Sequence, residues 1–416
     1  MSEYFHKIGR SIGTGVTAIG NRSGSRGWTA WFSERCDTYH TGIEEHDFDA
    51  VLINNMTVYE NDYIYYAESS FHIDAQYANK SIAWKNEYMY FSDNNSATFT
   101  RRTYFKQANL ISMSRVFSNG NILFCTRLKA YLSKDDLRTY EEVIVRDLAG
   151  DPITTTFPKD YFRELVPGHE ITFNGKMHYI WGNYANVGAY GPVRYYHTDD
   201  CGETITVIYQ FGLTDPVKYA GDGDPTNDIH VRHVHAVVWN PNNSCWIGMT
   251  GDHRDWEEEC YLQKIQLDVE TGIWSVTEIA SGEWYKQTGG YVDNNNVLYF
   301  GMDQQPGSFY GVFSCPVSDL ANSANFSKVA NCPADAYGIS INEEGEMVVG
   351  FGVARTLVVI KDWGVSSQQI DPAHIPEITN GILNRIYPKN SNGWWRLDIN
   401  ERFPQWQYKT LFIKIK

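Results

Sequence analysis

One short segment concentrates the side chains best suited to proton transfer or metal binding. The run HVRHVHAVVW contains His230, Arg232, His233 and His235, and Asp252-His253-Arg254 follows a few residues later. In an extended chain alternate side chains share a face, so His233 and His235 are expected to point the same way. Imidazole exchanges a proton near neutral pH, and guanidinium neutralises a carboxylate. The pattern therefore indicates acid–base chemistry on an anionic substrate, or a metal site.

A repeated unit positions these residues. Seven times an apolar strand runs into a turn rich in Asn, Asp or Gly and a second strand follows, as expected of antiparallel hairpins. The last residues before the turns are numbers 58, 117, 173, 239, 292, 341 and 387. Their spacing runs from 46 residues (387 minus 341) to 66 residues (239 minus 173), the size of one propeller blade.

The repeat predicts an all-β fold, a single β-propeller of four-stranded antiparallel blades. Seven blades are expected, or six if the first unit is an N-terminal extension. No linker or low-complexity stretch divides the chain, so residues 1–416 are predicted to form one domain. The final unit lacks an outer strand, and a strand from the N-terminal segment of about 1–50, within residues 14–35, is expected to complete it.

A second pattern occupies the outer half of three units. SDNNSATF at 92–99, SKDDLRTY at 133–140 and TDDCGETI at 198–205 each fit Ser/Thr-x-Asp-x-Gly-x-Thr-aromatic with substitutions. These segments resemble the Asp boxes of the sialidase-type, or BNR-repeat, β-propeller superfamily. The resemblance implies a hairpin turn in which the Asp side chain accepts backbone N–H bonds. It implies nothing about catalysis, because such turns lie at blade edges.

Aligning the units compares equivalent positions on the innermost strands, which face the central channel of a propeller. Four residues before the turn stand His169, His235 and Tyr337, and two positions earlier stand His233 and Lys286. Strand alternation keeps both positions on one face of each strand. A set of imidazole, phenol and cationic groups is therefore predicted to line one mouth of the channel.

This set is similar in type to the His/Tyr/Arg sites of propeller polysaccharide lyases, which cleave uronic-acid glycans by β-elimination. The similarity implies a His base, Tyr337 as the acid and a cation that neutralises the carboxylate. The base is either His235 or His169. The candidate catalytic residues are His235, His169, Tyr337, His233 and Arg232. The candidate substrate-binding residues are Arg254, Lys286, Asp252 and His253.

Two other chemistries compete for these residues. Sialidases use an early Arg-Ile-Pro and three arginines on the substrate carboxylate, and this chain has no Arg-Ile-Pro. The pair His233 and His235, joined by Asp252 or His253, also suits a divalent metal ion such as Zn²⁺. A His pair in a strand is more often a hydrogen-bonded part of a packed or wet channel, so we predict no cofactor and keep the metal as the alternative.

Composition restricts the partners. The formal net charge of −15 provides no general basic field for nucleic acid. No unbroken apolar run approaches the roughly 18 residues of a membrane span, and the N-terminus has no secretory apolar core. We therefore expect a carbohydrate or polysaccharide partner and a cytoplasmic or virion-associated location, with the oligomeric state open. The alternative is a non-catalytic structural or receptor-binding propeller, such as a viral tail component.

Overall fold

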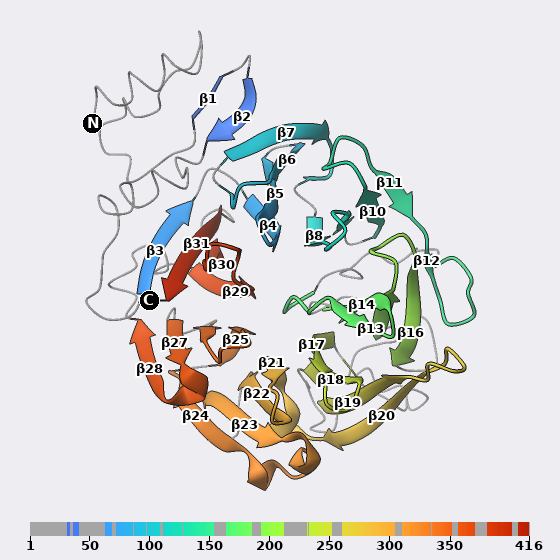
Figure 1. The fold of residues 1–416 in the computed structure, drawn as a ribbon, viewed down its shortest axis with the longest axis vertical. Helices are drawn as coiled ribbons and strands as arrows, with labels where there is room; N and C mark the ends of the chain where they lie inside the picture. The colour runs from blue at the N-terminus through green and yellow to red at the C-terminus, as the bar shows by residue number, and fades with distance from the viewer. Residues whose placement is uncertain are drawn as a thin grey trace, which may run out of the picture.

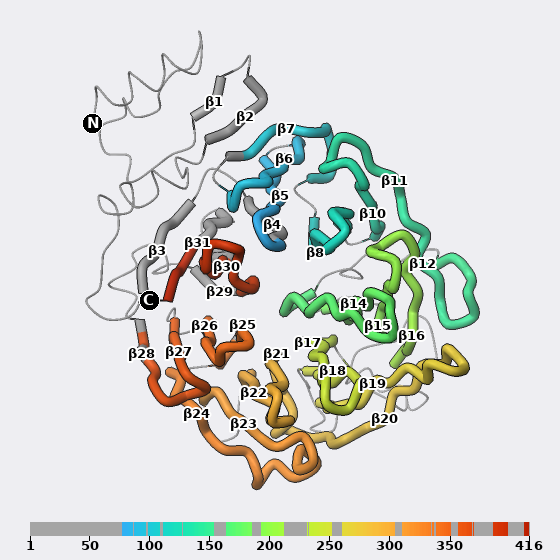
Figure 2. Tube along the Cα trace, in the orientation of Figure 1, coloured from blue at the N-terminus to red at the C-terminus, as the bar shows by residue number. Residues whose placement is uncertain are grey.

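The computed structural model is a ring of seven β-sheets around a central axis (Figure 1). Each sheet contains four antiparallel strands, which confirms the seven-bladed prediction. The structure describes residues 31–33, 36–40, 63–68, 72–85, 87–96, 98–108, 111–126, 128–153, 164–184, 193–211, 231, 233–251, 260–303, 310–333, 335–351, 357–370, 381–401 and 407–415. Figure 2 follows the chain from the blue first blade to the red last blade.

Of the first three blades, the first and the third carry additional strands at their outer edges. From the axis outward, their antiparallel strands are β4 (His72–Tyr77), β5 (Lys80–Lys85), β6 (Tyr88–Ser92) and β7 (Thr98–Tyr104); β8 (Ile111–Val116), β9 (Ile122–Thr126), β10 (Ala130–Ser133) and β11 (Glu141–Val143); and β13 (Ile171–Phe173), β14 (Lys176–Gly182), β15 (Val193–Thr198) and β16 (Ile205–Phe211). The strands β1 (Trp31–Ser33) and β2 (Cys36–His40) extend the first sheet beyond β7. The strand β12 (Val145–Arg146) leaves the second blade and pairs in parallel with β16.

The remaining blades are regular four-stranded sheets. Their strands are β17 (His233–Asn240), β18 (Cys245–Gly251), β19 (Tyr261–Leu267) and β20 (Trp274–Ser281); β21 (Gln287–Val292), β22 (Val297–Met302), β23 (Gly311–Pro316) and β24 (Ser327–Asn331); β25 (Ala336–Ile341), β26 (Met347–Phe351), β27 (Leu357–Lys361) and β28 (Ser366–Ile370); and β29 (Gly381–Tyr387), β30 (Trp395–Glu401) and β31 (Gln407–Ile415) with β3 (Tyr63–Glu68). Short 3-10 turns connect some of them, namely η4 (Glu283–Tyr285), η6 (Val317–Asp319), η7 (Ser323–Asn325) and η8 (Asp362–Gly364).

The ring closes between β3 and β31. These strands pair antiparallel from Tyr63 opposite Ile415 to Glu68 opposite Thr410, so an early strand completes the seventh blade. The closing strand was expected within residues 1–50, and β3 lies downstream of that segment. The predicted first unit has its first strand and turn at residues 51–62, which lie outside the described residues, and the strand predicted to follow them is β3 of the seventh blade. The innermost hairpin of the first blade is β4–β5, whose short turn at Ala78 and Asn79 has Asn79 as its single turn-forming residue.

The innermost strands share an irregularity that the sequence alignment did not include. The pairing of β4, β8, β17, β21, β25 and β29 with the next strand shifts register near the start of each strand. Such a bulge inserts an extra residue and breaks the strict alternation of side chains. The assumption that residues on both sides of the bulge face the channel together therefore fails for these strands.

Apolar side chains from neighbouring sheets form the core between blades. Ile247 and Met249 of the fourth blade join Leu298 and Phe300 of the fifth in one buried cluster. The side chains of six of the seven cysteines are described, and these six are free thiols. No helix within the described ranges is long and apolar enough to cross a membrane.

Three outer turns repeat one hydrogen-bond pattern. In the second blade the Ser133 hydroxyl accepts the Leu137 N–H at 2.9 Å, and Asp135 Oδ1 accepts the Thr139 N–H at 2.8 Å. In the third blade Thr198 and Asp200 do the same for Gly202 and Thr204, each at 2.9 Å. The turn between β6 and β7 keeps the first of these bonds, from Ser96 N–H to the Ser92 hydroxyl. The motif therefore marks the turn between the third and fourth strands of a blade.

We predict that Asp135→Ala destabilises the protein by about 1–2 kcal/mol, because two hydrogen bonds from Thr139 to this carboxylate are lost. Chemical denaturation monitored by intrinsic fluorescence measures the change. Asp136→Asn is the matched control, since the neighbouring Asp136 makes only a partly exposed contact of 3.5 Å with Lys80. An equal loss of stability in both variants would contradict the role assigned to Asp135.

Candidate functional site

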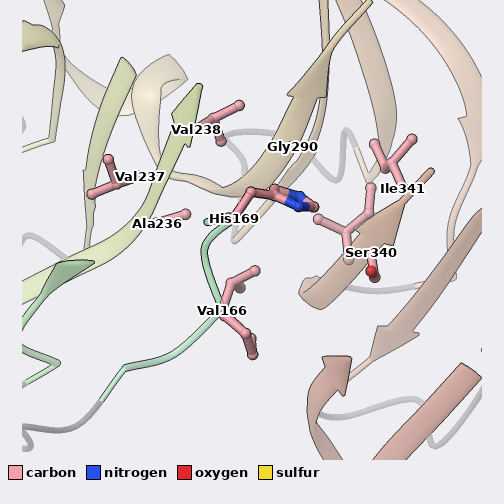
Figure 3. Close-up of a pocket in the computed structure, with 10 residues that line it drawn as sticks. Val166, His169, Ala236, Val237, Val238, Gly290, Ser340 and Ile341 are labelled. Carbon is pink, nitrogen blue, oxygen red and sulfur yellow. The ribbon is translucent and has the colours of Figure 1, made fainter. Parts of the chain in front are cut away.

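Two hollows share Pro167 and His169 in their linings. The larger has a volume of about 380 Å³ and is open to solvent; its walls come from the β4–β5 hairpin, β8, residues 167–170 and the β29–β30 hairpin. The smaller has a volume of about 10 Å³, enough for about one water molecule, between residues 166–169 and the strands β17, β21 and β25. Figure 3 shows His169 between Ala236 and Ser340, with its ring directed toward the β25 side. The larger hollow is termed the mouth pocket below.

An irregular segment before β13 brings His169 into the channel. Glu164 holds this segment: its carboxylate accepts the Gly168 N–H at 2.9 Å and the Tyr179 hydroxyl at 2.7 Å. Arg115 of β8 donates from Nη1 to the Gly168 carbonyl at 2.6 Å, and its guanidinium lies 4.4 Å from the Tyr179 ring centroid. The wall of the pocket is thus fixed by buried charged and aromatic groups, not by strand pairing.

Most ionisable groups of the mouth pocket already have protein partners. Desolvation, with a smaller effect of the Arg115 charge, lowers the pKa of His169 to about 4, so its imidazole is neutral at neutral pH. Glu170 accepts the Ser118 N–H at 3.0 Å. Lys389 pairs with Glu346, with Nζ and Oε2 2.5 Å apart. The pocket is therefore a polar surface with compensated charges and no evident proton-transfer pair among its described residues.

His233 and His235 lie elsewhere, at the start of β17, and both are only 1% exposed. Their Nε2 atoms are 3.1 Å apart. His235 Nδ1 is 2.9 Å from the Gln287 carbonyl oxygen of the next blade, and Tyr184 stacks on the His233 ring at 4.0 Å between centroids. The structure thus brings these two predicted residues together, whereas His169 lines the smaller hollow with the residues of β17 that follow them, Ala236, Val237 and Val238.

The other predicted residues divide into two groups. Lys286 is buried, 4% exposed, just before β21, and its carbonyl accepts the Asp303 N–H. Tyr337 occupies the bulge of β25, between Ala336 and Gly338, and its side chain lies outside the described residues. Also outside them are Arg232, Asp252, His253 and Arg254.

Several pocket residues were missed by the sequence analysis. Lys389 and Ser391 come from the segment between β29 and β30, Tyr77 is the last residue of β4, and Arg115 lies one position before the end of β8. Each reaches the pocket because four blades converge on it, and no local motif marks such positions. The β4–β5 turn was itself hidden by the misplaced first unit.

A second histidine pair lies between the third and fourth blades. His178 Nδ1 and His197 Nε2 are 3.0 Å apart, and the two residues are 2% and 7% exposed. The rings contact Trp246 and Trp274. Desolvation lowers the pKa of His197 to about 4, helped by His178 and Lys176 and opposed by Asp199 and Asp200. This pair is packed in the protein interior. Because burial disfavours the charged imidazole of His197, the pair lowers the stability of the folded state as the pH falls.

Comparison with known proteins shows the fold and no family. No family model and no curated protein matches the chain. Among solved structures, a catalytically inactive virginiamycin B lyase from Staphylococcus aureus with quinupristin has a TM-score of 0.50 at 10% identity, covering 85% of this chain and 100% of that one. YCF48 bound to D1 peptide has a TM-score of 0.48 at 10% identity, covering 86% and 99%. At such identities the likeness shows the propeller fold alone.

These neighbours correct the family resemblance drawn from the outer turns. They include YCF48, streptogramin B lyase, the Dos1 propeller and a putative gluconolactonase, none of which is named as a sialidase-type, BNR-repeat or polysaccharide-lyase propeller. The resemblance was wrong because the motif encodes a turn. Ser, Asp and Thr side chains that bond nearby N–H groups suit any tight hairpin of this shape, whatever the family.

We predict that stability falls as the pH drops from about 6.5 toward 4, and that His197→Gln makes this fall shallower. The unfolded chain protonates His197 near its ordinary pKa of 6.5, whereas the folded chain resists until about pH 4, so acid favours unfolding. The difference per histidine is about 1.4 kcal/mol per pH unit at most. Denaturation midpoints between pH 7 and pH 4 measure it; identical slopes in both proteins would exclude His197 as a source.

Proposed function

We propose that the protein is a carbohydrate-binding propeller, and that the mouth pocket holds the sugar without cleaving it. The observation that carries this proposal is the composition of the pocket wall, which joins turns of four blades around the channel. It presents hydroxyl, amide and charged groups from Ser114, Arg115, Glu170, Asn390 and Ser391. Such converging polar groups in a concave site fix the orientation of a small polar ligand.

An aromatic ring completes the match to a sugar. Tyr77, the last residue of β4, lines the same pocket and is 39% exposed. An exposed tyrosine offers an apolar face with a polar tip, which suits the C–H face and the hydroxyl rim of a pyranose. Because Lys389 and Glu170 already have partners, the pocket favours an uncharged polar ligand over an acidic one.

The described residues support binding more than β-elimination. A general base must reach the substrate and hold a pKa near the working pH. His233 and His235 are buried and bonded to each other, and His235 is also bonded to the Gln287 carbonyl. His169 does line the pocket, but a pKa of about 4 makes it a weak base at neutral pH. Lyase chemistry stays a prediction without a placed base.

The proposal predicts that Tyr77→Ala weakens sugar binding about tenfold, equivalent to about 1.4 kcal/mol. A glycan array would first identify the ligand, and isothermal titration calorimetry would compare the variants. Tyr104→Ala is the matched control, because Tyr104 is 49% exposed on β7, the fourth strand of the same blade, and does not line the pocket. Equal weakening by both substitutions, or no binding to any glycan by folded protein, would contradict the proposal.

A separate experiment tests the claim that the protein binds the sugar without cleaving it. Uronic-acid polysaccharides are incubated with the protein, and the ultraviolet absorbance of the double bond formed by β-elimination is followed. A flat trace together with binding supports the proposal. A rising trace that His169→Ala abolishes would overturn it in favour of a lyase.

A further inference from the structure

We propose that the sugar held in the mouth pocket is an N-acetylated hexosamine, whose acetamido group is bound between Arg115 and Asn390. This inference rests on the proposed carbohydrate binding and names the class of sugar. An acetamido group combines an acceptor carbonyl, a donor N–H and a methyl group, and it carries no charge. The wall of the pocket offers a counterpart for each of these three parts.

Asn390 lines the pocket with an amide of fixed orientation. Its Oδ1 accepts the Asn392 N–H at 3.0 Å and the Trp394 N–H at 2.9 Å, both within the turn between β29 and β30. Because both partners are donors, the atom that they contact is the amide oxygen, and Nδ2 is left with two N–H groups. No acceptor within the described ranges bonds Nδ2. Asn390 therefore offers a ligand only donors.

Arg115 supplies further donors on another wall of the same pocket. Its guanidinium carries five N–H groups, and Nη1 donates to the Gly168 carbonyl at 2.6 Å. Among the residues that the structure describes, no carboxylate forms an ion pair with it. A carbonyl oxygen accepts two hydrogen bonds and has no proton of its own to place, so it matches a wall of donors better than a hydroxyl does.

Charge balance favours a neutral carbonyl over a carboxylate. Glu170 lines the pocket together with Arg115, so one negative and one positive side chain face the same ligand. A ligand carboxylate would be attracted by Arg115 and repelled by Glu170. The Glu170 carboxylate already accepts the Ser118 N–H at 3.0 Å, and a carboxylate has room for about four such bonds, so it can also accept the N–H of an amide.

Apolar side chains line the pocket beside these polar groups. Ala78, Pro167 and Pro388 all belong to its wall, and none of these side chains can hydrogen-bond. Contact with a methyl group removes such surface from water, whereas a hydroxyl at the same position of the sugar does not. The pocket volume of about 380 Å³ lies within the range of small-ligand sites, with Tyr77 available for the pyranose ring.

The test compares two trisaccharides of the same linkage, triacetylchitotriose and cellotriose, which differ by an acetamido group or a hydroxyl at C2 of each unit. Both are titrated by calorimetry into the full chain. We expect the N-acetylated sugar to bind at least about tenfold more tightly, since the hydroxyl form leaves pocket donors unpaired. N-acetylalanine methylamide, an amide without a sugar, should bind more weakly than triacetylchitotriose.

Asn390→Asp tests the assigned contact. The substitution keeps the oxygen that the Asn392 and Trp394 N–H groups need and removes both Nδ2 donors. The preference for the N-acetylated sugar should fall at least about threefold, while the affinity for cellotriose stays within about twofold. Asn392→Asp is the matched control, because it adds the same charge in the same turn at a residue that does not line the pocket. Its preference should equal that of the wild type.

The outcomes separate the two proposals. Binding of both trisaccharides without preference, or an unchanged preference in folded Asn390→Asp, would overturn the N-acetyl inference and leave carbohydrate binding intact. Tight binding of the methylamide alone would replace the sugar by a peptide. No binding to any glycan would remove both proposals. If Asn390→Asp does not fold, saturation-transfer NMR on the wild type decides: the acetyl methyl protons should receive the strongest saturation, and weaker saturation there than on the ring protons would overturn the inference.

Discussion

Closure of the ring is the constraint on which the rest of the structure depends. Six antiparallel pairs between Tyr63–Glu68 of β3 and Thr410–Ile415 of β31 join the early chain to its end. At the seam between the closed seventh blade and the first blade, Ser391 N–H donates to the Ala78 carbonyl of the β4–β5 turn at 3.2 Å, and the Ser391 hydroxyl donates to Asn95 Oδ1 of the β6–β7 turn at 2.9 Å. The mouth pocket spans this seam, so the pocket exists only when the ring is closed.

The same constraint accounts for the repeated bulges. Innermost strands crowd together at the axis, and six of them carry a register shift near their first residues. A bulge bends a strand and redirects one side chain. In β17 that side chain belongs to His235, which turns toward Gly251 and the Gln287 carbonyl of the neighbouring blade. The histidine contact across blades is thus a product of ring geometry as well as of sequence.

The structural features that could be predicted are those determined by a few consecutive residues. Hairpin turns recur at blade spacing, so the innermost hairpins of six blades and the positions of the Asp135 and Asp200 turns followed from residue types alone, whereas the hairpin of the first blade did not. The closing strand could not be predicted, because Tyr63–Glu68 pairs with residues almost 350 positions away and alternates like any other strand. The mouth pocket could not be predicted either, because Tyr77 and Lys389 come from the first and the seventh blade and lie together only when the ring is closed. The pair His233 and His235 was found, but its burial depended on an unseen bulge.

The two ends of the channel differ in a way that follows from chain direction. Each innermost strand begins after a connection between blades and ends in a tight turn to its neighbour. The turn end gathers short polar loops around neutral His169, which suits reversible contact with a polar ligand. The beginning of β17 instead buries two imidazoles, which contact each other and, through His235, the Gln287 carbonyl of the next blade. The solvent-accessible surface to which ligand binding is proposed and a buried polar contact between neighbouring blades therefore occur at different points along the same set of innermost strands.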